Sequence, residues 1–348
     1  NYIDLGKDCS TAEINPLFSD SVYIDRLSRI PAIMEMPYND IIRKFIDMYA
    51  GRLRNQVSFM LSACNFYMPI FEEALDAYGL PLELRYLPII ESALNPSAVS
   101  RAGASGLWQF MIGTGKIYGL ESNSLVDERR DPIKATWAAA RYLKEMYDIY
   151  GDWNLVIAAY NCGPGTINKA IRRANGETDY WKIYNYLPKE TRGYVPAFIA
   201  ANYVMTYYCD HNICPMETNI PASTDTVQVN KNLHFEQIAD LCNVPLDQIK
   251  SLNPQYKKQM IPGDSKPYTL RLPIDAISTF IDKQDTIYAH RADELFRNRK
   301  TVAVKEITPS TRKTTAAVAG KGKLTYYTIK SGDTLSTIAG KYGVTIKD

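Results

Sequence analysis

Cysteine and histidine are scarce in this sequence. Its 348 residues include six cysteines, spread from Cys9 to Cys242, and three histidines. This density is too low for a fold held together by disulfides. Cys209 and Cys214 are close enough for a turn to bring them within bridging distance, and His211 between them makes a metal site the alternative interpretation. Because a fourth ligand and a zinc-type spacing are missing, we predict neither a metal nor a cofactor.

Long apolar runs and a strong excess of one charge are also missing. No stretch approaches the roughly 18 consecutive apolar residues that cross a membrane. The formal net charge is +2 at pH 7, so no overall field draws the protein toward nucleic acid or acidic membranes. The chain opens Asn-Tyr-Ile-Asp, without Met or the basic-then-apolar pattern of a signal peptide. This opening predicts a mature or trimmed product that has lost its targeting segment.

Helical periodicity dominates the first two thirds of the chain. Residues 1–37, with Pro16 and Pro31, are predicted to be irregular. Asn39 can cap a helix that carries Ile42, Ile46 and Tyr49 on one face. Further helices are predicted over residues 52–63, 68–78, 131–150 and 192–208. The pattern therefore predicts an all-α domain over residues 38–214.

The pattern changes after Cys214. Short strand-like and helical runs at 226–229, 235–241, 246–252 and 268–272 predict a β-α-α-β unit over residues 221–275. Residues 303–323 are rich in Thr, Ala, Lys, Gly and Pro without periodicity, which is typical of a flexible linker, and we assign 276–323 to a connecting segment. Residues 324–348 open like another small domain and stop before it closes.

Glu91 is the most unusual carboxylate in the helical part. A helix here would place it at the end of an apolar stripe that also contains Leu84, Leu87 and Pro88. A carboxyl group against apolar walls has a raised pKa, because burial disfavours its charged form. Such a group can donate a proton to a glycosidic oxygen at neutral pH. The alternative is a structural glutamate that reaches solvent or pairs with a neighbouring arginine.

Four ordered motifs decide between these readings of Glu91. The run from Gly79 to Pro96 closely resembles the catalytic motif of the soluble-lytic-transglycosylase family of lytic transglycosylases. Three more segments resemble that family's later motifs in the same order: Ala-Ser-Gly-Leu-Trp-Gln-Phe at 104–110, Ala-Tyr-Asn-Cys-Gly at 159–163 and Thr-Arg-Gly-Tyr-Val-Pro at 191–196. Four ordered motifs over about 120 residues make the resemblance specific.

The resemblance extends to a branch of this family. Trp108 stands where many members have Met, and Trp is typical of the membrane-bound type D branch, which carries C-terminal LysM modules. Residues 325–344 match the opening of a LysM module. The 221–275 unit resembles a divergent LysM module with Asn230-Lys231-Asn232 in place of the usual Ser-Gly-Asp, which leaves its glycan binding open. The implied fold is mainly α: a lysozyme-like (goose-type or SLT) helical catalytic domain followed by small βααβ LysM modules.

The resemblance also implies roles for single residues. Glu91 would act as acid and then as base, cleaving the bond between N-acetylmuramic acid and N-acetylglucosamine in peptidoglycan and leaving a 1,6-anhydromuramyl end without a cofactor. Tyr160 follows the apolar run 155–159 and from its position alone is a core residue. Gly106 and Gly163 are expected to serve backbone turns. The residues expected to contact sugar or orient Glu91 are Ser92, Ser105, Gln109, Tyr160, Asn161 and Tyr194.

Three rival functions remain open from the sequence. A muramidase would hydrolyse the same bond with water and would need a second carboxylate, for which Glu83, Asp127, Glu128 and Asp131 are available. A non-catalytic wall-binding protein and a chitinase-like enzyme are the others. The family resemblance implies a bacterial envelope location, in the periplasm, with an outer-membrane lipid anchor outside this chain. Peptidoglycan glycan strands are the expected partner, and no nucleic acid is expected.

Overall fold

Buried apolar side chains form two cores in the part of the chain that the structure describes. This part comprises residues 3, 14–218, 220–221 and 223–296 of a computed structural model. The first core lies mainly in a helical region over residues 20–211, and the second lies mainly in a smaller unit over residues 224–287. The predicted linker over 303–323 and the predicted LysM opening over 324–348 lie outside the described residues.

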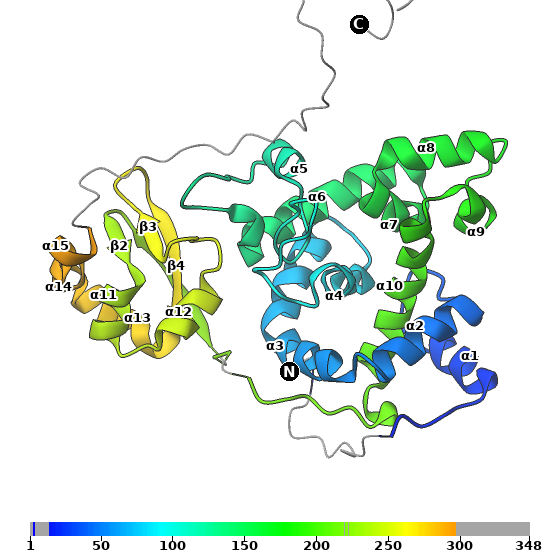
Figure 1. Cartoon of the computed structure of the whole chain (residues 1–348), viewed down its shortest axis with the longest axis horizontal. Helices are drawn as coiled ribbons and strands as arrows, with labels where there is room; N and C mark the ends of the chain where they lie inside the picture. The colour runs from blue at the N-terminus through cyan, green and yellow to red at the C-terminus, as the bar shows by residue number, and fades with distance from the viewer. Residues whose placement is uncertain (1–2, 4–13, 219, 222, 297–348) are drawn as a thin grey trace, which may run out of the picture. The chain divides into compact units, whose positions relative to one another are not determined.

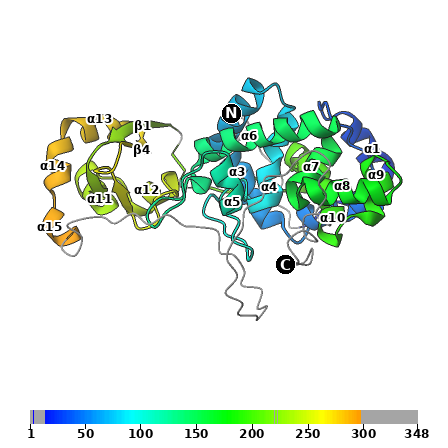
Figure 2. The ribbon, with the colours of Figure 1, turned by 90° about the horizontal axis from the view of Figure 1, so that it is seen from above.

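The helical region confirms the mainly α class predicted from the sequence. Figures 1 and 2 place the short helix α4 in the middle of this region, with longer helices around it. α4 packs against α10 and the turn before it, so its side chains lie near the centre of the region. The helices are α1 (Asp20–Ser28), α2 (Asp40–Ala50), α3 (Arg54–Ala77), α4 (Leu87–Ser92), α5 (Ile112–Ile117), α6 (Pro132–Tyr150), α7 (Trp153–Cys162), α8 (Pro164–Arg173), α9 (Tyr180–Ile183) and α10 (Lys189–Tyr207).

Two helices begin and end as the sequence predicts. The Asn39 side chain accepts hydrogen bonds from the backbone N–H groups of Ile41 and Ile42 at the start of α2. Asp131 caps α6 in the same way, with Pro132 at the first helical position. Gly151 ends α6 with a φ of 62°, a left-handed conformation that glycine adopts at little cost.

Helix α3 corrects one prediction. The sequence predicted separate helices over 52–63 and 68–78, but a single helix runs from Arg54 to Ala77 through Pro69. The intervening Cys64 and Tyr67 are buried and continue the apolar face of the helix, whereas Pro69 lies on its exposed side. Packing along this continuous face stabilises the helix despite the hydrogen bond that proline removes.

The N-terminal segment contains a second correction. Residues 1–37 were predicted to be irregular, yet α1 spans Asp20–Ser28. Its inner face consists of Tyr23 and Leu27, both fully buried, and Arg26 stacks over the ring of Phe18 at 4.3 Å. Two apolar positions one turn apart are too few for a periodicity signal, so tertiary contacts determine this helix.

The smaller unit forms the predicted β-α-α-β arrangement over residues 224–273, which we call the βααβ module. Strand β1 (Thr224–Val229) pairs antiparallel with β4 (Tyr268–Pro273), and helices α11 (Phe235–Cys242) and α12 (Leu246–Leu252) lie between them in sequence. The strand pair β2 (Asn232–His234) and β3 (Met260–Pro262) was not predicted. After the module come α13 (Ile274–Asp282), α14 (Gln284–Ala289) and α15 (Ala292–Leu295).

The cysteine pair considered from the sequence does not form a bridge. Cys209 is disulfide-bonded, whereas Cys214 carries a thiol, so the two are not joined to each other. Nδ1 of buried His211 lies 2.7 Å from Oδ1 of Asn15, and its Nε2 lies 3.2 Å from the Tyr203 hydroxyl. Burial lowers the pKa of His211 to about 4. Among the described residues, no group of three or more His, Cys, Asp or Glu side chains could hold a metal ion.

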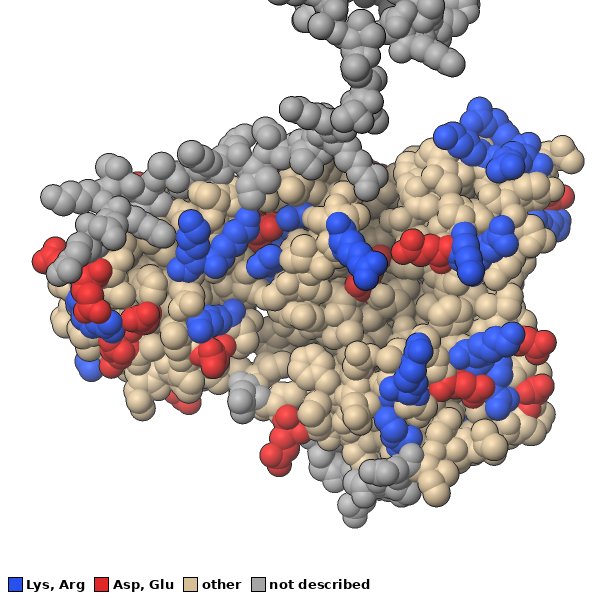
Figure 3. Space-filling view, viewed as in Figure 1, with Lys and Arg blue, Asp and Glu red and all other residues tan. Residues whose placement is uncertain are grey.

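The surface charge agrees with the nearly neutral composition. Figure 3 shows Lys, Arg, Asp and Glu in small mixed groups with uncharged surface between them, and neither sign covers this face. Over the described ranges, no helix combines the length and apolar character needed to cross a bilayer.

Candidate active site

Glu91 lies on α4, at the centre of the helical region. The sequence predicted one helical stripe over residues 84–91, but the chain forms a 3-10 turn over Leu82–Tyr86 and changes to an α-helix at Leu87. Leu84 and Leu87 are fully buried, which confirms the apolar stripe. Pro88 lies in the first turn of α4, where its missing N–H removes no intrahelical hydrogen bond.

A cavity of about 590 Å³ opens beside the Glu91 carboxyl group. Apolar side chains from α2, α3 and α4 form much of its wall, and polar side chains are contributed by α10 and by the loop over residues 103–110. A mostly apolar cavity with a few converging polar groups is the usual form of a ligand site. The lining includes Phe45, Tyr49, Met60, Ile89, Glu91, Ser92, Gln109, Glu190 and Tyr194.

The pKa of Glu91 is raised to about 7, with burial as the largest cause. The Tyr194 hydroxyl donates a hydrogen bond to Oε1 of Glu91 and counteracts part of this rise, because it stabilises the charged form. The negative charge of Glu190 raises the pKa further. At neutral pH the carboxyl group is therefore present in both its protonated and its charged form.

Two predicted site residues hold the 103–110 loop through its carbonyl groups. Ser92 Oγ lies 2.9 Å from the carbonyl oxygen of Pro88 and 3.0 Å from that of Leu107, so its hydroxyl can donate to either. The Tyr160 hydroxyl donates to the carbonyl oxygen of Trp108 at 2.7 Å. Ser92 lines the cavity, whereas Tyr160 is not among the lining residues.

Gln109 and Ser105 belong to the same loop but face different surroundings. Gln109 lines the cavity, and its Nε2 donates to the carbonyl oxygens of Ala98 and Gly106 at 3.2 and 2.8 Å. Ser105 is fully buried outside the cavity lining, and its hydroxyl accepts a hydrogen bond from Arg130 Nε at 3.1 Å. The structure therefore places Gln109, and not Ser105, beside Glu91.

Asn161 also lies away from the cavity lining. Its Oδ1 accepts a hydrogen bond at 2.9 Å from the Thr191 hydroxyl, which joins the end of α7 to the start of α10. Of the residues predicted to contact substrate, the structure brings Ser92, Gln109 and Tyr194 to the cavity with Glu91. Ser105, Tyr160 and Asn161 contact other parts of the protein.

Sequence reasoning missed Glu190. It lines the cavity and precedes Tyr194 by four positions on α10, so both side chains lie on the same face of that helix. This spacing was available in the sequence and would have indicated a carboxylate next to the final tyrosine motif.

The carboxylates considered for a hydrolytic mechanism lie elsewhere. Glu83 accepts a hydrogen bond from the backbone N–H of Met34 at 2.7 Å, and Asp131 caps α6. Asp127 forms an ion pair with Arg129, and Glu128 forms one with a lysine of α6. None of these four carboxylates lines the Glu91 cavity.

The two motif glycines serve turns, as predicted. Gly106 has a φ of 90°, and a Cβ atom on it would lie 1.7 Å from the carbonyl oxygen of Arg129. Gly163 has a φ of 80° between α7 and α8. At Gly106 both the backbone conformation and the close approach of Arg129 require glycine.

Family models match three segments of this chain. Residues 68–183 match the transglycosylase SLT domain, which includes Glu91 and the Ala-Tyr-Asn-Cys-Gly motif. Residues 223–289 match the LysM-like domain of lytic transglycosylase MltD, and residues 327–348 match the LysM domain. The chain thus belongs to the SLT lytic-transglycosylase family, and its helical region has the lysozyme-like class of that family.

Individual relatives narrow the resemblance to one type. The chain is 31% identical over 319 residues to membrane-bound lytic murein transglycosylase D of Escherichia coli K12, a match that covers 90% of this chain and 66% of that protein. It therefore spans slightly less than two thirds of this relative's length. The order of an SLT domain, an MltD-type LysM-like domain and a LysM domain makes it a type D-like member of the family.

Matches to other relatives are confined to the helical region or to part of each chain. Soluble lytic murein transglycosylase of Escherichia coli K12 is 33% identical over 124 residues, which covers 34% of this chain and 19% of that protein. The crystal structure of the 70 kDa soluble lytic transglycosylase from Escherichia coli matches with 29% identity and a TM-score of 0.36, covering 44% of this chain and 26% of the other.

Proposed function

We propose that this protein is a lytic transglycosylase that cleaves the β-1,4 bond between N-acetylmuramic acid and N-acetylglucosamine in peptidoglycan and leaves 1,6-anhydromuramyl ends. One observation carries the proposal most directly. Glu91 lies at a cavity in an SLT domain, and burial raises its pKa to about 7. A group with this pKa can donate and accept a proton at neutral pH.

The proposed reaction uses Glu91 twice. In the first step its carboxyl group protonates the glycosidic oxygen, and the bond between that oxygen and C1 of the muramyl sugar breaks. In the second step the resulting carboxylate removes the proton of the muramyl 6-hydroxyl group as that oxygen bonds to C1. No water is consumed, and Glu91 ends protonated again. Because the nucleophile belongs to the sugar, the site has only to hold the ring in a reactive shape.

The neighbours of Glu91 suit both steps. Burial favours the neutral carboxylic acid that the first step needs, and the Tyr194 hydroxyl stabilises the carboxylate that forms afterwards. We assign Gln109 and Ser92 to the substrate side of the cavity, since both line it. We assign Ser105, Tyr160 and Asn161 to positioning, because their polar groups bind Arg130, the Trp108 carbonyl and Thr191.

We further propose that residues 38–214 form the catalytic domain, 221–275 a divergent LysM-like module, and 324–348 the start of a LysM module. Peptidoglycan glycan strands are the proposed partner. The Escherichia coli relatives are named as membrane-bound murein enzymes. We therefore place this protein in the bacterial envelope, in the periplasm, with attachment to the outer membrane through a lipid anchor outside this chain.

Mass spectrometry of muropeptides tests the activity. Wild-type protein and Glu91→Gln are each incubated with purified peptidoglycan, with Glu73→Gln as a control because Glu73 is an exposed glutamate in the same region. We expect anhydromuramyl products, lighter by one water than hydrolysis products, from the wild type and the control only. Release of no product by the wild type, or equal release by Glu91→Gln, would favour a non-catalytic wall-binding protein.

A hydrolytic muramidase is the second candidate, and Glu190 is the observation that favours it. This carboxylate lines the same cavity as Glu91 and could activate a water molecule. Hydrolysis would give reducing muramic acid ends, and Glu190→Gln would then abolish their formation. The transglycosylase proposal instead expects anhydro products from both wild type and Glu190→Gln. Offering chitin beside peptidoglycan separates a chitinase-like activity, since it would release soluble product from chitin.

A further inference from the structure

The segment over residues 121–130 connects the βααβ module to the active-site loop. Backbone hydrogen bonds of 2.8 Å run from Lys257 N–H to the carbonyl of Leu125 and from Asp127 N–H to the carbonyl of Gln255. They flank an antiparallel bridge between Val126 and a tyrosine of the module. Leu125 and Val126 are buried within the core of the module itself. The segment thus belongs to the helical region in sequence and to the module in packing.

Polar side chains reinforce this contact. Lys257 Nζ donates to the carbonyl oxygen of Asn123 at 2.8 Å and lies 3.9 Å from Oδ2 of Asp127. Tyr268 of β4 donates to the carboxylate of Glu121 at 3.0 Å, and Lys266 forms an ion pair with the same carboxylate at 2.7 Å. Several independent contacts therefore fix residues 121–127 against the module.

Asp127 passes the contact on to Arg129. Its two carboxylate oxygens accept hydrogen bonds at 2.9 and 2.8 Å from Nε and a terminal nitrogen of Arg129, and both side chains are almost fully buried. Burial alone would raise the pKa of Asp127, but the hydrogen bonds and charge of Arg129, with Lys257 behind them, lower it below its ordinary value. The pair is therefore held in its charged form.

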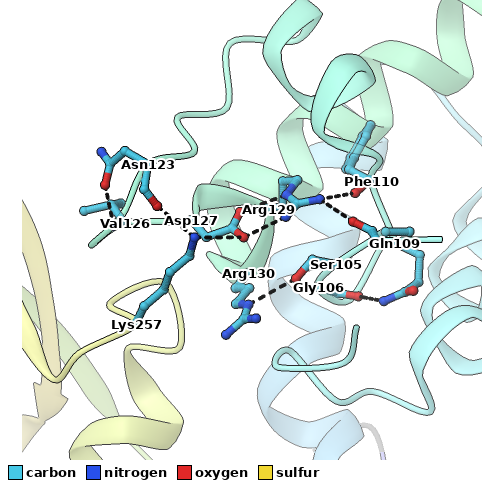
Figure 4. A network of polar contacts seen from close by, with 12 residues as sticks. Ser105, Gly106, Gln109, Phe110, Asn123, Val126, Asp127, Arg129, Arg130 and Lys257 are labelled. Carbon is cyan, nitrogen blue, oxygen red and sulfur yellow. Dashed lines mark hydrogen bonds and ion pairs between the residues drawn. The ribbon is translucent and has the colours of Figure 1, made fainter. Parts of the chain in front are cut away.

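Arg129 in turn holds both ends of the 103–110 loop. Its remaining terminal nitrogen donates to the carbonyl oxygens of Gly103 and Phe110 at 2.8 and 2.9 Å. Figure 4 shows the whole series, from Lys257 through Asp127 and Arg129 to the loop that carries Gln109. Gln109 lines the Glu91 cavity, so the last member of the series belongs to the candidate active site.

We infer that the βααβ module is a positioning element of the active site: through residues 121–129 it fixes the 103–110 loop and thereby places Gln109 beside Glu91. The inference rests on the proposed function for its effect on catalysis. It assigns Asp127, Arg129 and Lys257 as positioning residues. It also gives the module a role that does not require glycan binding, in agreement with its Asn230-Lys231-Asn232 sequence in place of Ser-Gly-Asp.

A matched pair of variants in the full chain tests the inference. Val126→Ala removes two methyl groups from the contact between segment and module, whereas Val244→Ala removes the same groups elsewhere in the same core. Lys257→Met removes the ammonium that reaches Asn123 and Asp127, and Lys258→Met alters its exposed neighbour. Thermal melting of every variant identifies any that do not fold.

Hydrogen exchange of the loop measures the coupling without reference to activity. We expect amides of residues 103–110 to lose protection in Val126→Ala and Lys257→Met and to keep it in Val244→Ala and Lys258→Met. Lys257→Arg, which retains the positive charge, should restore protection. If exchange in the loop is the same in Val126→Ala and Val244→Ala, the module does not position the loop and the inference is wrong.

Kinetics on a short soluble glycan measure the effect on catalysis. We expect kcat of Val126→Ala and Lys257→Met to fall about tenfold, since a misplacement of about 1 Å can cost about 100-fold. KM should change less than kcat, whereas loss of a glycan-binding module would raise KM for long strands and leave kcat unchanged. Unchanged kcat in both variants contradicts the inference, while an inactive wild type contradicts the proposed function and leaves the exchange result to decide the coupling.

Discussion

The Glu91 cavity and the buried contact around Asp127 each enclose a carboxylate, yet their pKa values move in opposite directions. Burial raises the pKa of Glu91 to about 7, where the hydrogen-bond partner is the uncharged hydroxyl of Tyr194. Asp127 is also buried, but two hydrogen bonds from the Arg129 guanidinium lower its pKa. Burial alone therefore does not make a catalytic acid, because the charge of the partner decides which form is stable.

This difference separates chemistry from architecture within one helical region. A neutral partner leaves the proton of Glu91 exchangeable near neutral pH, as acid and base catalysis require. A cationic partner keeps Asp127 charged and aligns Arg129 with the carbonyl groups of the 103–110 loop. The following predictions test the two surroundings against each other, from the largest expected effect to the smallest.

Glu91→Gln should lower the rate of glycan cleavage by about 100-fold to 10,000-fold, the usual contribution of a general acid or base. It should also stabilise the protein near neutral pH. The folded pKa of about 7 lies above the ordinary value of about 4.3, so ionisation makes the wild type less stable as pH rises from about 4 to 7. Muropeptide release and denaturant unfolding at pH 4 and pH 8 measure both effects. A catalytic rate like that of Glu73→Gln would remove Glu91 from the mechanism.

Asp127→Asn should lower the free energy of unfolding by about 3–5 kcal/mol, because it leaves the buried charge of Arg129 without its counter-charge. The folded pKa of Asp127 lies below its ordinary value. Its stabilisation is therefore present above about pH 4 and is lost as pH falls through the folded pKa. The wild type and the variant should converge in stability in acid, as measured by urea unfolding across pH.

The surface pair of Lys144 and Asp148 is the control for this prediction. Both side chains are largely exposed, so Asp148→Asn should change stability by less than about 1 kcal/mol. A loss in Asp127→Asn as small as that of Asp148→Asn would show that the buried pair does not stabilise the fold.

Gly106→Ala should destabilise the protein more than Gly119→Ala. Both glycines have positive φ, at 90° and 83°, so each alanine has a backbone cost of about 1–3 kcal/mol. Only at Gly106 would the new Cβ meet the carbonyl oxygen of Arg129, at 1.7 Å, whereas Gly119 has open space. Thermal melting compares the two variants. Equal losses would mean that the close approach of Arg129 to the loop is not a constraint.

Tyr194→Phe should move the basic limb of the pH–rate profile to higher pH. The Tyr194 hydrogen bond lowers the pKa of Glu91, so its removal keeps the carboxyl group protonated to a higher pH. Tyr160→Phe is the matched variant, since its hydroxyl binds the Trp108 carbonyl instead, and it should leave the limb in place. A limb that does not move in Tyr194→Phe would contradict the role of this hydrogen bond.

Glu190→Gln should shift the same limb slightly, in the opposite direction. The negative charge of Glu190 raises the pKa of Glu91 and is the smallest of the three causes. Without it Glu91 ionises at lower pH, so the basic limb should move down by less than it moves up in Tyr194→Phe. Added salt should reduce the shift, as expected for a charge at a cavity wall.

The sequence by itself determined features that depend on near neighbours along the chain. Asn39 and Asp131 cap helices that follow at once, and the alternation of short strands and helices predicted the βααβ module. The motif around Glu91 identified the family and the candidate acid before any geometry was known. Its apolar stripe of Leu84 and Leu87 also lies in the core as predicted.

Only the tertiary structure decided which motif residues reach the cavity. Ser105, Tyr160 and Asn161 belong to the family motifs, yet their polar groups bind other parts of the protein, while Glu190 joins Glu91 and Tyr194 at the wall. These outcomes depend on contacts between segments far apart in sequence, which no local pattern encodes. The insertion of Leu125 and Val126 into the core of the βααβ module is such a contact, and it became visible only in the fold.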